Sequence, residues 1–122
     1  MTSLYGIYGI GGCGRGIMPL AREQLGSRVG ARLVFVDDQG GELAVNGHDV
    51  LTLDQFMAVP ARERAIAVAI ADPATRQEVV ERCRAAGAGF FQVRASNAIE
   101  MDEVVIGEGA LISPFVTFTS NI

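Results

Sequence analysis

The segment from Leu4 to Arg15, LYGIYGIGGCGR, joins a short apolar run to a glycine cluster, and an amphipathic stretch follows it. Gly9, Gly11 and Gly14 fit the spacing G-x-G-x-x-G. In that pattern the first glycine permits a tight strand-to-helix turn, the second lets backbone approach a phosphate, and the third lets helix and strand pack closely. The segment therefore favours a nucleotide- or phosphate-binding loop, with a purely turn-forming glycine cluster as the alternative.

The helix expected after this loop offers its N-terminal amides and the positive end of its dipole to an anion. Arg15 adds a fixed positive charge beside the same place. Together these features predict that an anionic ligand binds where the first strand ends and the first helix begins.

The chain has 122 residues, 49% hydrophobic and 20% charged, with a formal net charge of -4. This length is enough for one domain with a buried core. The ten basic residues are scattered, which argues against nucleic acid as a partner. The longest strictly apolar run, Ala65–Ala71, is far shorter than the ~20 residues that cross a bilayer. We expect no membrane insertion, no signal peptide and a cytoplasmic location, with Cys13 and Cys83 reduced and not spaced for a metal.

Strand and helix patterns alternate along the chain, which predicts an α/β fold, and the first strand, helix and second strand form a βαβ unit of suitable length for a parallel sheet. Pro19 is expected in the first turns of the first helix, where proline is tolerated. The pair Asp72-Pro73 is a strong helix start. The expected strands are Leu4–Tyr8, Ala31–Val36, Ala65–Ala71 and Phe90–Val93; the expected helices follow the glycine loop as far as Gly26, cover Leu53–Val59, and run from Pro73 to Gly87.

Polar residues at predicted strand ends are candidate ligand contacts, because open α/β sheets bind ligands there. Asp37 follows the second strand at a spacing that suits a ribose hydroxyl, and a turn role is equally compatible with it. For Asp38 the turn role is favoured. Asp72 is chiefly a helix cap, and Arg76, one turn into that helix, either contacts the ligand or is a solvated surface residue. His48, the single histidine, is expected in a loop and not in a catalytic role.

The last part of the chain has no helical pattern. Ile106, Ile112 and Phe118 recur every six residues, with small or turn-forming residues between them. A six-residue period is typical of a β-solenoid, in which each repeat forms one face of a triangular coil. So few repeats do not bury a solenoid core. We therefore expect two parts, 1–97 and 98–122, and a longer protein of which this is the N-terminal portion.

The sequence resembles the N-terminal domain of bacterial sugar acetyltransferases of the left-handed β-helix class. This class includes the sialic-acid O-acetyltransferases and the N-acetyltransferases of nucleotide-linked amino sugars. The resemblance covers essentially the whole chain. It is carried, in this order, by Ile7–Arg15, Val34–Asp38, Val45–Gly47, Val50–Phe56, Val68–Asp72 with Arg76, and Ile106–Gly107.

The resemblance implies a small Rossmann-like domain that holds a nucleotide-sugar, usually a UDP-sugar, followed by the first coils of a left-handed β-helix. It implies acetyl-CoA as the cofactor of the full-length enzyme, a homotrimer, surface glycan biosynthesis as the process, and a general-base histidine on a later coil. Asp37 and Asp38 would face the uridine. The residues implied to line the site are Gly9, Gly11, Gly12, Cys13, Gly14, Arg15, Asp37, Asp38, Ala71, Asp72 and Arg76.

Two departures from the family pattern matter. Cys13 stands where the glycine loop of the family often has histidine, and a thiol is a weaker hydrogen-bond partner. No residue of this chain matches the coil histidine, so these 122 residues are expected to bind the sugar without transferring an acetyl group. Two alternatives remain: a stand-alone NAD- or nucleotide-binding module, and a structural domain whose glycines only form turns.

Overall fold

A computed structural model describes residues 2–26, 28–39, 41–100, 111–112 and 117–118. Its centre is a six-stranded sheet in the order β3-β4-β2-β1-β5-β6. β1 (Ser3–Tyr8) pairs in parallel with β2 (Ala31–Val36) on one side and with β5 (Glu63–Val68) on the other. This parallel βαβ arrangement confirms the α/β fold expected from the sequence.

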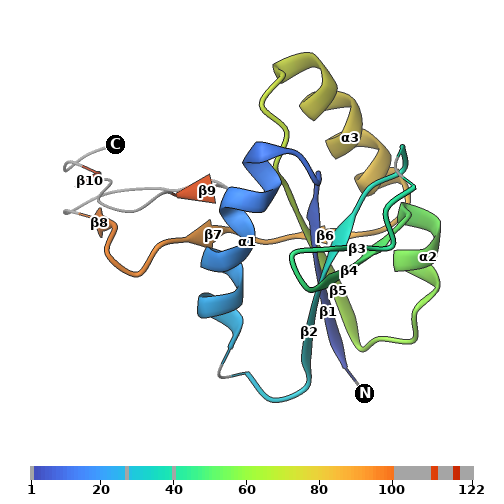
Figure 1. Cartoon of the computed structure of the whole chain (residues 1–122), viewed down its shortest axis with the longest axis horizontal. Helices are drawn as coiled ribbons and strands as arrows, with labels where there is room; N and C mark the ends of the chain where they lie inside the picture. Colours follow the sequence, from blue (N-terminus) through green and yellow to red (C-terminus); the bar gives the residue numbers. More distant parts are fainter. Residues whose placement is uncertain (1, 27, 40, 101–110, 113–116, 119–122) are drawn as a thin grey trace.

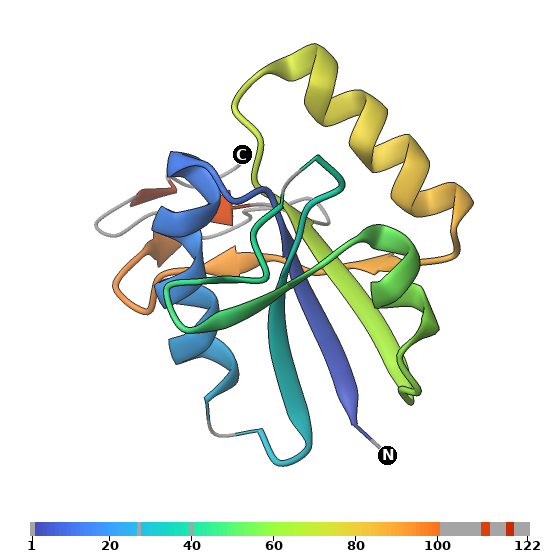
Figure 2. The same ribbon diagram turned by 45° about the vertical axis from the view of Figure 1, so that its right-hand side comes forward.

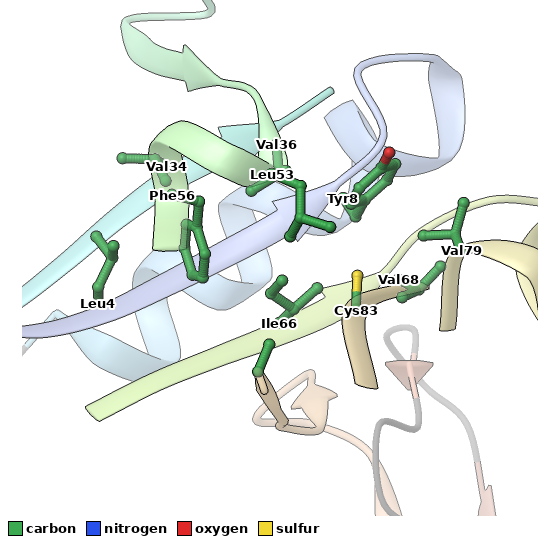
Figure 3. Close-up of a cluster of buried hydrophobic side chains, with 11 residues drawn as sticks. Leu4, Tyr8, Val34, Val36, Leu53, Phe56, Ile66, Val68, Val79 and Cys83 are labelled. Atoms are coloured by element: carbon green, nitrogen blue, oxygen red, sulfur yellow. The ribbon is translucent and has the colours of Figure 1, made fainter. Parts of the chain in front are cut away.

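Three helices cover the two faces of this sheet, as Figures 1 and 2 show. α1 (Gly12–Leu25) lies on one face, and α2 (Leu53–Ala58) and α3 (Pro73–Ala85) lie on the other. Alternate residues of β1 point to opposite faces, since side chains alternate along a strand. Ile7 therefore packs against the α1 side with Met18, while Leu4 and Phe56 pack on the side of α2. Figure 3 shows the second of these cores.

The sequence places most element boundaries correctly and misses a few. β5 begins at Glu63 and ends at Val68, so the predicted third strand is displaced toward the C-terminus. Residues 69–71 form the loop before α3 instead. The single strand predicted at Phe90–Val93 is two short strands, β6 (Gly89–Phe90) and β7 (Val93–Arg94), which belong to different sheets. The apolar run alone does not mark where pairing stops, because the first loop residue, Ala69, is buried as the strand residues before it are.

Pro19 lies in the interior of α1, not in its first turns, because the helix already begins at Gly12. Its ring occupies the exposed face, where water can replace the missing backbone hydrogen bond. The other helix signals are confirmed. Gly26 is the C-cap of α1, and Asp72 caps α3 with its side chain.

An antiparallel hairpin follows β2, and the pair Asn46-Gly47, which is typical of two-residue hairpin turns, joins its strands. It consists of β3 (Ala44–Val45) and β4 (His48–Leu51). Asn46 and Gly47 both have positive φ, 49° and 80°, which two-residue hairpin turns require. His48 is thus in a strand, where Arg22 is 3.0 Å from its Nε2 atom, and not in the expected loop.

After α3 the chain crosses to the α1 side of the sheet. The side-chain amide of Gln24 fixes it there, donating to the carbonyl of Gln92 and accepting from the amide of Arg94, both at 2.8 Å. β7 then pairs in parallel with β9 (Leu111–Ile112), and β8 (Ile99–Glu100) with β10 (Thr117–Phe118). Ile106 and Gly107, where the predicted coils start, lie outside the described residues.

Candidate functional site

A cleft of about 660 Å³ opens at the C-terminal ends of the central strands. One wall is the glycine loop between β1 and α1, and the other is one face of α3 together with the loop that precedes it. This is where ligands of open α/β sheets bind. The lining residues are Tyr8, Gly9, Ile10, Gly11, Gly12, Cys13, Asp37, Gln39, Ala69, Ile70, Ala71, Thr75, Glu78, Val79 and Arg82.

Each glycine of the G-x-G-x-x-G pattern has its own place in the structure. Gly9 has φ +121°, and a Cβ atom there would lie 2.7 Å from the carbonyl oxygen of Ala69. Gly14 is where α1 approaches the loop, and a Cβ atom there would lie 1.8 Å from the carbonyl oxygen of Gly9. Gly11 is the N-cap of α1, and a Cβ atom there would meet nothing within 4 Å. The first and third glycines are thus required by backbone packing, whereas the space beside the second belongs to the cleft.

The N-terminus of α1 has neither a side-chain cap nor an acidic residue in its first turn. Helices leave their first amide groups without partners inside the helix, and a side chain, water or a ligand takes them. Here the first residues of the helix, Gly12 and Cys13, line the cleft together with the N-cap Gly11, and Cys13 is exposed. The local structure suits a negatively charged group at this wall.

Two acidic residues, Asp37 and Asp38, directly follow β2, and their environments differ. Asp37 lines the cleft, and one of its carboxylate oxygens is 3.5 Å from the amide of Gln39. Asp38 is held by two hydrogen bonds from the fold: one oxygen accepts from the amide of Leu53 at 2.8 Å and the other from the hydroxyl of Tyr8 at 2.7 Å. Asp38 therefore fixes the start of α2 and the position of Tyr8, and it is not among the lining residues.

The two predicted cationic contacts lie outside this cleft. Arg15 turns its Nε atom back to the carbonyl of Gly11, at 3.4 Å. Arg76 is exposed and donates, at 3.4 and 3.5 Å, to the carbonyls of Ile70 and Ala71. Both side chains turn back to carbonyls of residues that line the cleft, and neither arginine is itself among the lining residues.

Asp72 and Gly14 also lie outside the lining. The carboxylate of Asp72 accepts from the backbone amide and the hydroxyl of Thr75, at 2.9 and 2.8 Å. These two hydrogen bonds, the backbone one first, lower the pKa of Asp72. Of the predicted site residues, the structure therefore brings Gly9, Gly11, Gly12, Cys13, Asp37 and Ala71 together in the cleft.

The sequence reasoning missed the contribution of α3. Thr75, Glu78, Val79 and Arg82 lie three and four residues apart, so they share one face of the helix, and all four line the cleft. The spacing can be read from the sequence. The sequence does not indicate that this face of the helix lies toward the glycine loop and not toward solvent.

Tyr8 and Arg82, which both line the cleft, form a polar cluster with Asp38. The Tyr8 hydroxyl donates to Asp38 and accepts from Nη2 of Arg82, which is also 3.5 Å from the Asp38 carboxylate. Figure 3 shows Tyr8 at the edge of the apolar core, with its hydroxyl directed away from the other labelled side chains. Burial, and then the hydrogen bond to Asp38, raise the pKa of Tyr8 above its ordinary value.

A second cleft, of about 500 Å³, lies between α1 and the β7 segment, lined in part by Glu23, Gln24 and Arg94. It contains no glycine loop and no C-terminal end of a central strand.

None of the helices in the described ranges is long and apolar enough to cross a membrane.

No family model matches the sequence. A GDP-perosamine N-acetyltransferase of Escherichia coli O157:H7 is 38% identical over 121 residues, which cover 98% of this chain and 55% of that protein. Among solved structures, WeeI from Acinetobacter baumannii AYE is 36% identical with a TM-score of 0.90, over 98% of this chain and 57% of that one. This chain is a homologue of the N-terminal part of sugar N-acetyltransferases.

The homology confirms the family resemblance seen in the sequence. The chain spans about half the length of the relatives it matches. PerB from Caulobacter crescentus, solved with CoA and GDP-perosamine, shares the fold at 22% identity and a TM-score of 0.78, over 96% of this chain and 54% of that one. These relatives give no support to the alternative of a stand-alone NAD-binding module.

Proposed function

We propose that this chain is the nucleotide-sugar-binding part of an acetyl-CoA-dependent sugar N-acetyltransferase of glycan biosynthesis. The observation that carries the proposal is the cleft between the glycine loop and α3, with an uncapped helix N-terminus at its wall. Its volume lies within the range of about 300–1,000 Å³ usual for small-molecule sites. Two of the relatives named above, the GDP-perosamine N-acetyltransferase and PerB, are described with a nucleotide-sugar, and this supports the choice of ligand.

In this proposal the loop from Gly9 to Cys13 binds the diphosphate through backbone amides. Asp37, at the end of β2, accepts hydrogen bonds from the ribose or the base, because its carboxylate is the one of the acidic pair that lines the cleft. The other predicted site residues do not contact the ligand in this proposal and only hold the loops in place; they are Gly14, Arg15, Asp38, Asp72 and Arg76. The NAD-binding and purely structural alternatives both lack a specific observation in their favour.

The nucleotide is the open part of the specificity. The sequence resemblance implies a uridine diphosphate sugar, whereas the curated relative is named for GDP-perosamine. That relative is 38% identical over nearly the whole chain, so we propose the guanosine nucleotide first and test the uridine nucleotide beside it. The same name supports an amine, not a hydroxyl, as the acetyl acceptor.

The short strands after the sheet support a β-helix that begins in this chain. Val93 pairs with Leu111, and Ile99 with Thr117. Each pair joins residues three hexapeptide periods apart, which is the spacing of one turn of a triangular coil. We therefore keep the division into residues 1–97 and 98–122, and we propose that further coils bind acetyl-CoA and form the homotrimer.

The chemistry of transfer would be attack of the sugar amine on the acetyl-CoA thioester. This chain contributes by positioning the acceptor, which raises the rate through proximity and orientation. His48, the single histidine of the sequence, packs against Phe35 and does not line the cleft, so the general base would come from later coils. We also propose a cytoplasmic location, and the free thiols of Cys13 and Cys83 are compatible with it.

Calorimetric titration of this chain with GDP, UDP and NAD tests the proposal, with Gly11→Val as the paired variant. A Cβ atom at position 11 meets nothing within 4 Å, so a side chain there extends into open space beside the loop, and a thermal melt checks that the variant folds. Saturable binding of GDP or UDP that the variant loses is the expected result. Binding of NAD in preference, or nucleotide binding that Gly11→Val leaves intact, contradicts it.

A further inference from the structure

Arg82 is the positive charge among the described residues that line the cleft. Asp37 and Glu78 line it too, and both are negative at neutral pH. A diphosphate brought into such a cleft meets two carboxylates, which repel it. A cation among the lining residues is therefore needed to offset them. Arg15 and Arg76 are not lining residues, and each turns back to a loop carbonyl, that of Gly11 and that of Ile70 respectively.

The guanidinium of Arg82 is held from one side. Nη2 donates to the Tyr8 hydroxyl and lies 3.5 Å from the Asp38 carboxylate, and the guanidinium carbon is 5.8 Å from the centre of the Tyr8 ring. Tyr8 is 4% exposed, and Asp38 is fixed in turn by the amide of Leu53. The clamp on Arg82 thus consists of groups that are themselves fixed by the fold.

The other two nitrogen atoms of the Arg82 guanidinium, Nε and Nη1, have no hydrogen-bond partner within the described part of the chain. Just over half of this side chain is exposed, at 55%. An arginine that is already oriented loses less conformational freedom when it binds a ligand. Guanidinium groups also bind phosphate oxygens through two parallel hydrogen bonds, which lysine cannot do.

We propose that Arg82, clamped by Tyr8 and Asp38, binds the diphosphate of the nucleotide from the side opposite the glycine loop. Tyr8 and Asp38 are then positioning residues, and Asp38 acts on the ligand through Arg82 and not by direct contact. This inference rests on the proposed function for the identity of the ligand. It assigns the phosphate-binding cation to a helix that the glycine-loop motif does not include.

The test compares binding of GDP, guanosine and inorganic pyrophosphate to wild-type chain, Arg82→Ala and Tyr8→Phe. Charge-assisted hydrogen bonds imply that Arg82→Ala weakens GDP and pyrophosphate binding by about 10- to 100-fold. Guanosine binding stays unchanged, because guanosine carries no phosphate. Tyr8→Phe weakens GDP binding several-fold in the wild-type background and has no further effect in the Arg82→Ala background, as coupled residues do.

Arg84→Ala is the matched control. It removes the same charge from the same helix, and its guanidinium lies over the ring of Phe90, away from the cleft lining. This variant is expected to bind GDP as the wild type does, and thermal melts of all variants check that they fold. Equal GDP affinity in Arg82→Ala and wild type overturns the inference, and so does an equal loss of guanosine and GDP, since that indicates a role in shape or in base recognition.

The two proposals fail in different ways. Wild-type chain that binds neither GDP nor UDP refutes the proposed function, and the pyrophosphate arm then judges Arg82 by itself. Pyrophosphate binding that depends on Arg82 supports the clamped cation. Pyrophosphate binding that is absent, or indifferent to Arg82, overturns it.

Discussion

Replacing Gly14 by alanine tests how closely α1 packs against the glycine loop. The new Cβ atom would lie 1.8 Å from the carbonyl oxygen of Gly9 and 2.7 Å from its carbonyl carbon. Real Cβ atoms essentially never come within 3.0 Å of another heavy atom, so the helix and the loop must separate by more than about 1 Å. The obstacle is backbone and has no rotamer to change.

In Gly14→Ala we expect the steric clash by itself to cost about 3 kcal/mol, which is the upper part of the range for overpacked positions. Alanine favours helices over glycine by up to about 1 kcal/mol, which offsets part of this cost. The net loss of about 2 kcal/mol corresponds to a fall in Tm of about 8 °C for a domain of this size. The assay is urea unfolding followed by circular dichroism, with thermal melts beside it.

Gly16→Ala is the control, since it adds the same methyl group two residues further along the same helix. A Cβ atom at Gly16 meets nothing within 4 Å, and the residue is exposed. It should therefore gain about 0.5–1 kcal/mol from helix propensity alone. If both variants are stabilised alike, the close approach of α1 to Gly9 is wrong, and with it the packing role of the third glycine.

Three further predictions concern caps and thiols. Thr52→Ala removes the capping box of α2 and should cost about 1 kcal/mol in urea unfolding; an unchanged midpoint contradicts the cap geometry. The pKa of Asp72 is lowered from its unfolded value of 3.8, so its carboxylate stabilises the fold above that pH, and this stabilisation is lost as the pH falls through the folded pKa. As the pH is lowered from 6 to 2.5, the Tm of the wild type should therefore fall more steeply than the Tm of Asp72→Asn. A thiol reagent at pH 8 should modify exposed Cys13 in the native chain and Cys83 only after unfolding, because burial raises the pKa of Cys83 to about 11; prompt reaction of both would place Cys83 outside the core.

The sequence predicts the fold well because its signals are local. The glycine pattern, the pair Asp72-Pro73 and the turn at Asn46 each prescribe a backbone conformation whatever surrounds them. The errors fall where tertiary pairing decides. Ala69 continues the apolar run of the strand, yet its carbonyl lies against Gly9 and the chain leaves the sheet there. Phe91 continues an apolar run, yet its amide makes the last bond to the central sheet, at Ile66.

The candidate site is less predictable, because a cleft is made by elements that meet only in the folded chain. Asp37 and Asp38 are neighbours of identical chemistry, and alternation along the chain sends one to the cleft and the other to Tyr8. Composition does not distinguish them. Half of the predicted site, the loop and Asp37, follows from a local motif, whereas the other wall requires knowing where α3 packs.

Arg82 shows why sequence spacing misleads at that wall. Glu78 stands four residues before it, and this spacing predicts an ion pair on a solvated helix face. Exposed pairs of that kind are worth only a few tenths of a kcal/mol, so any better partner supplied by the fold prevails. The Tyr8 hydroxyl and the Asp38 carboxylate are such partners, because both are partly buried and already held in place. Arg82 therefore turns to the strand ends, and the same turn leaves Glu78 and the free guanidinium groups to face the cleft, where a ligand has to be recognised.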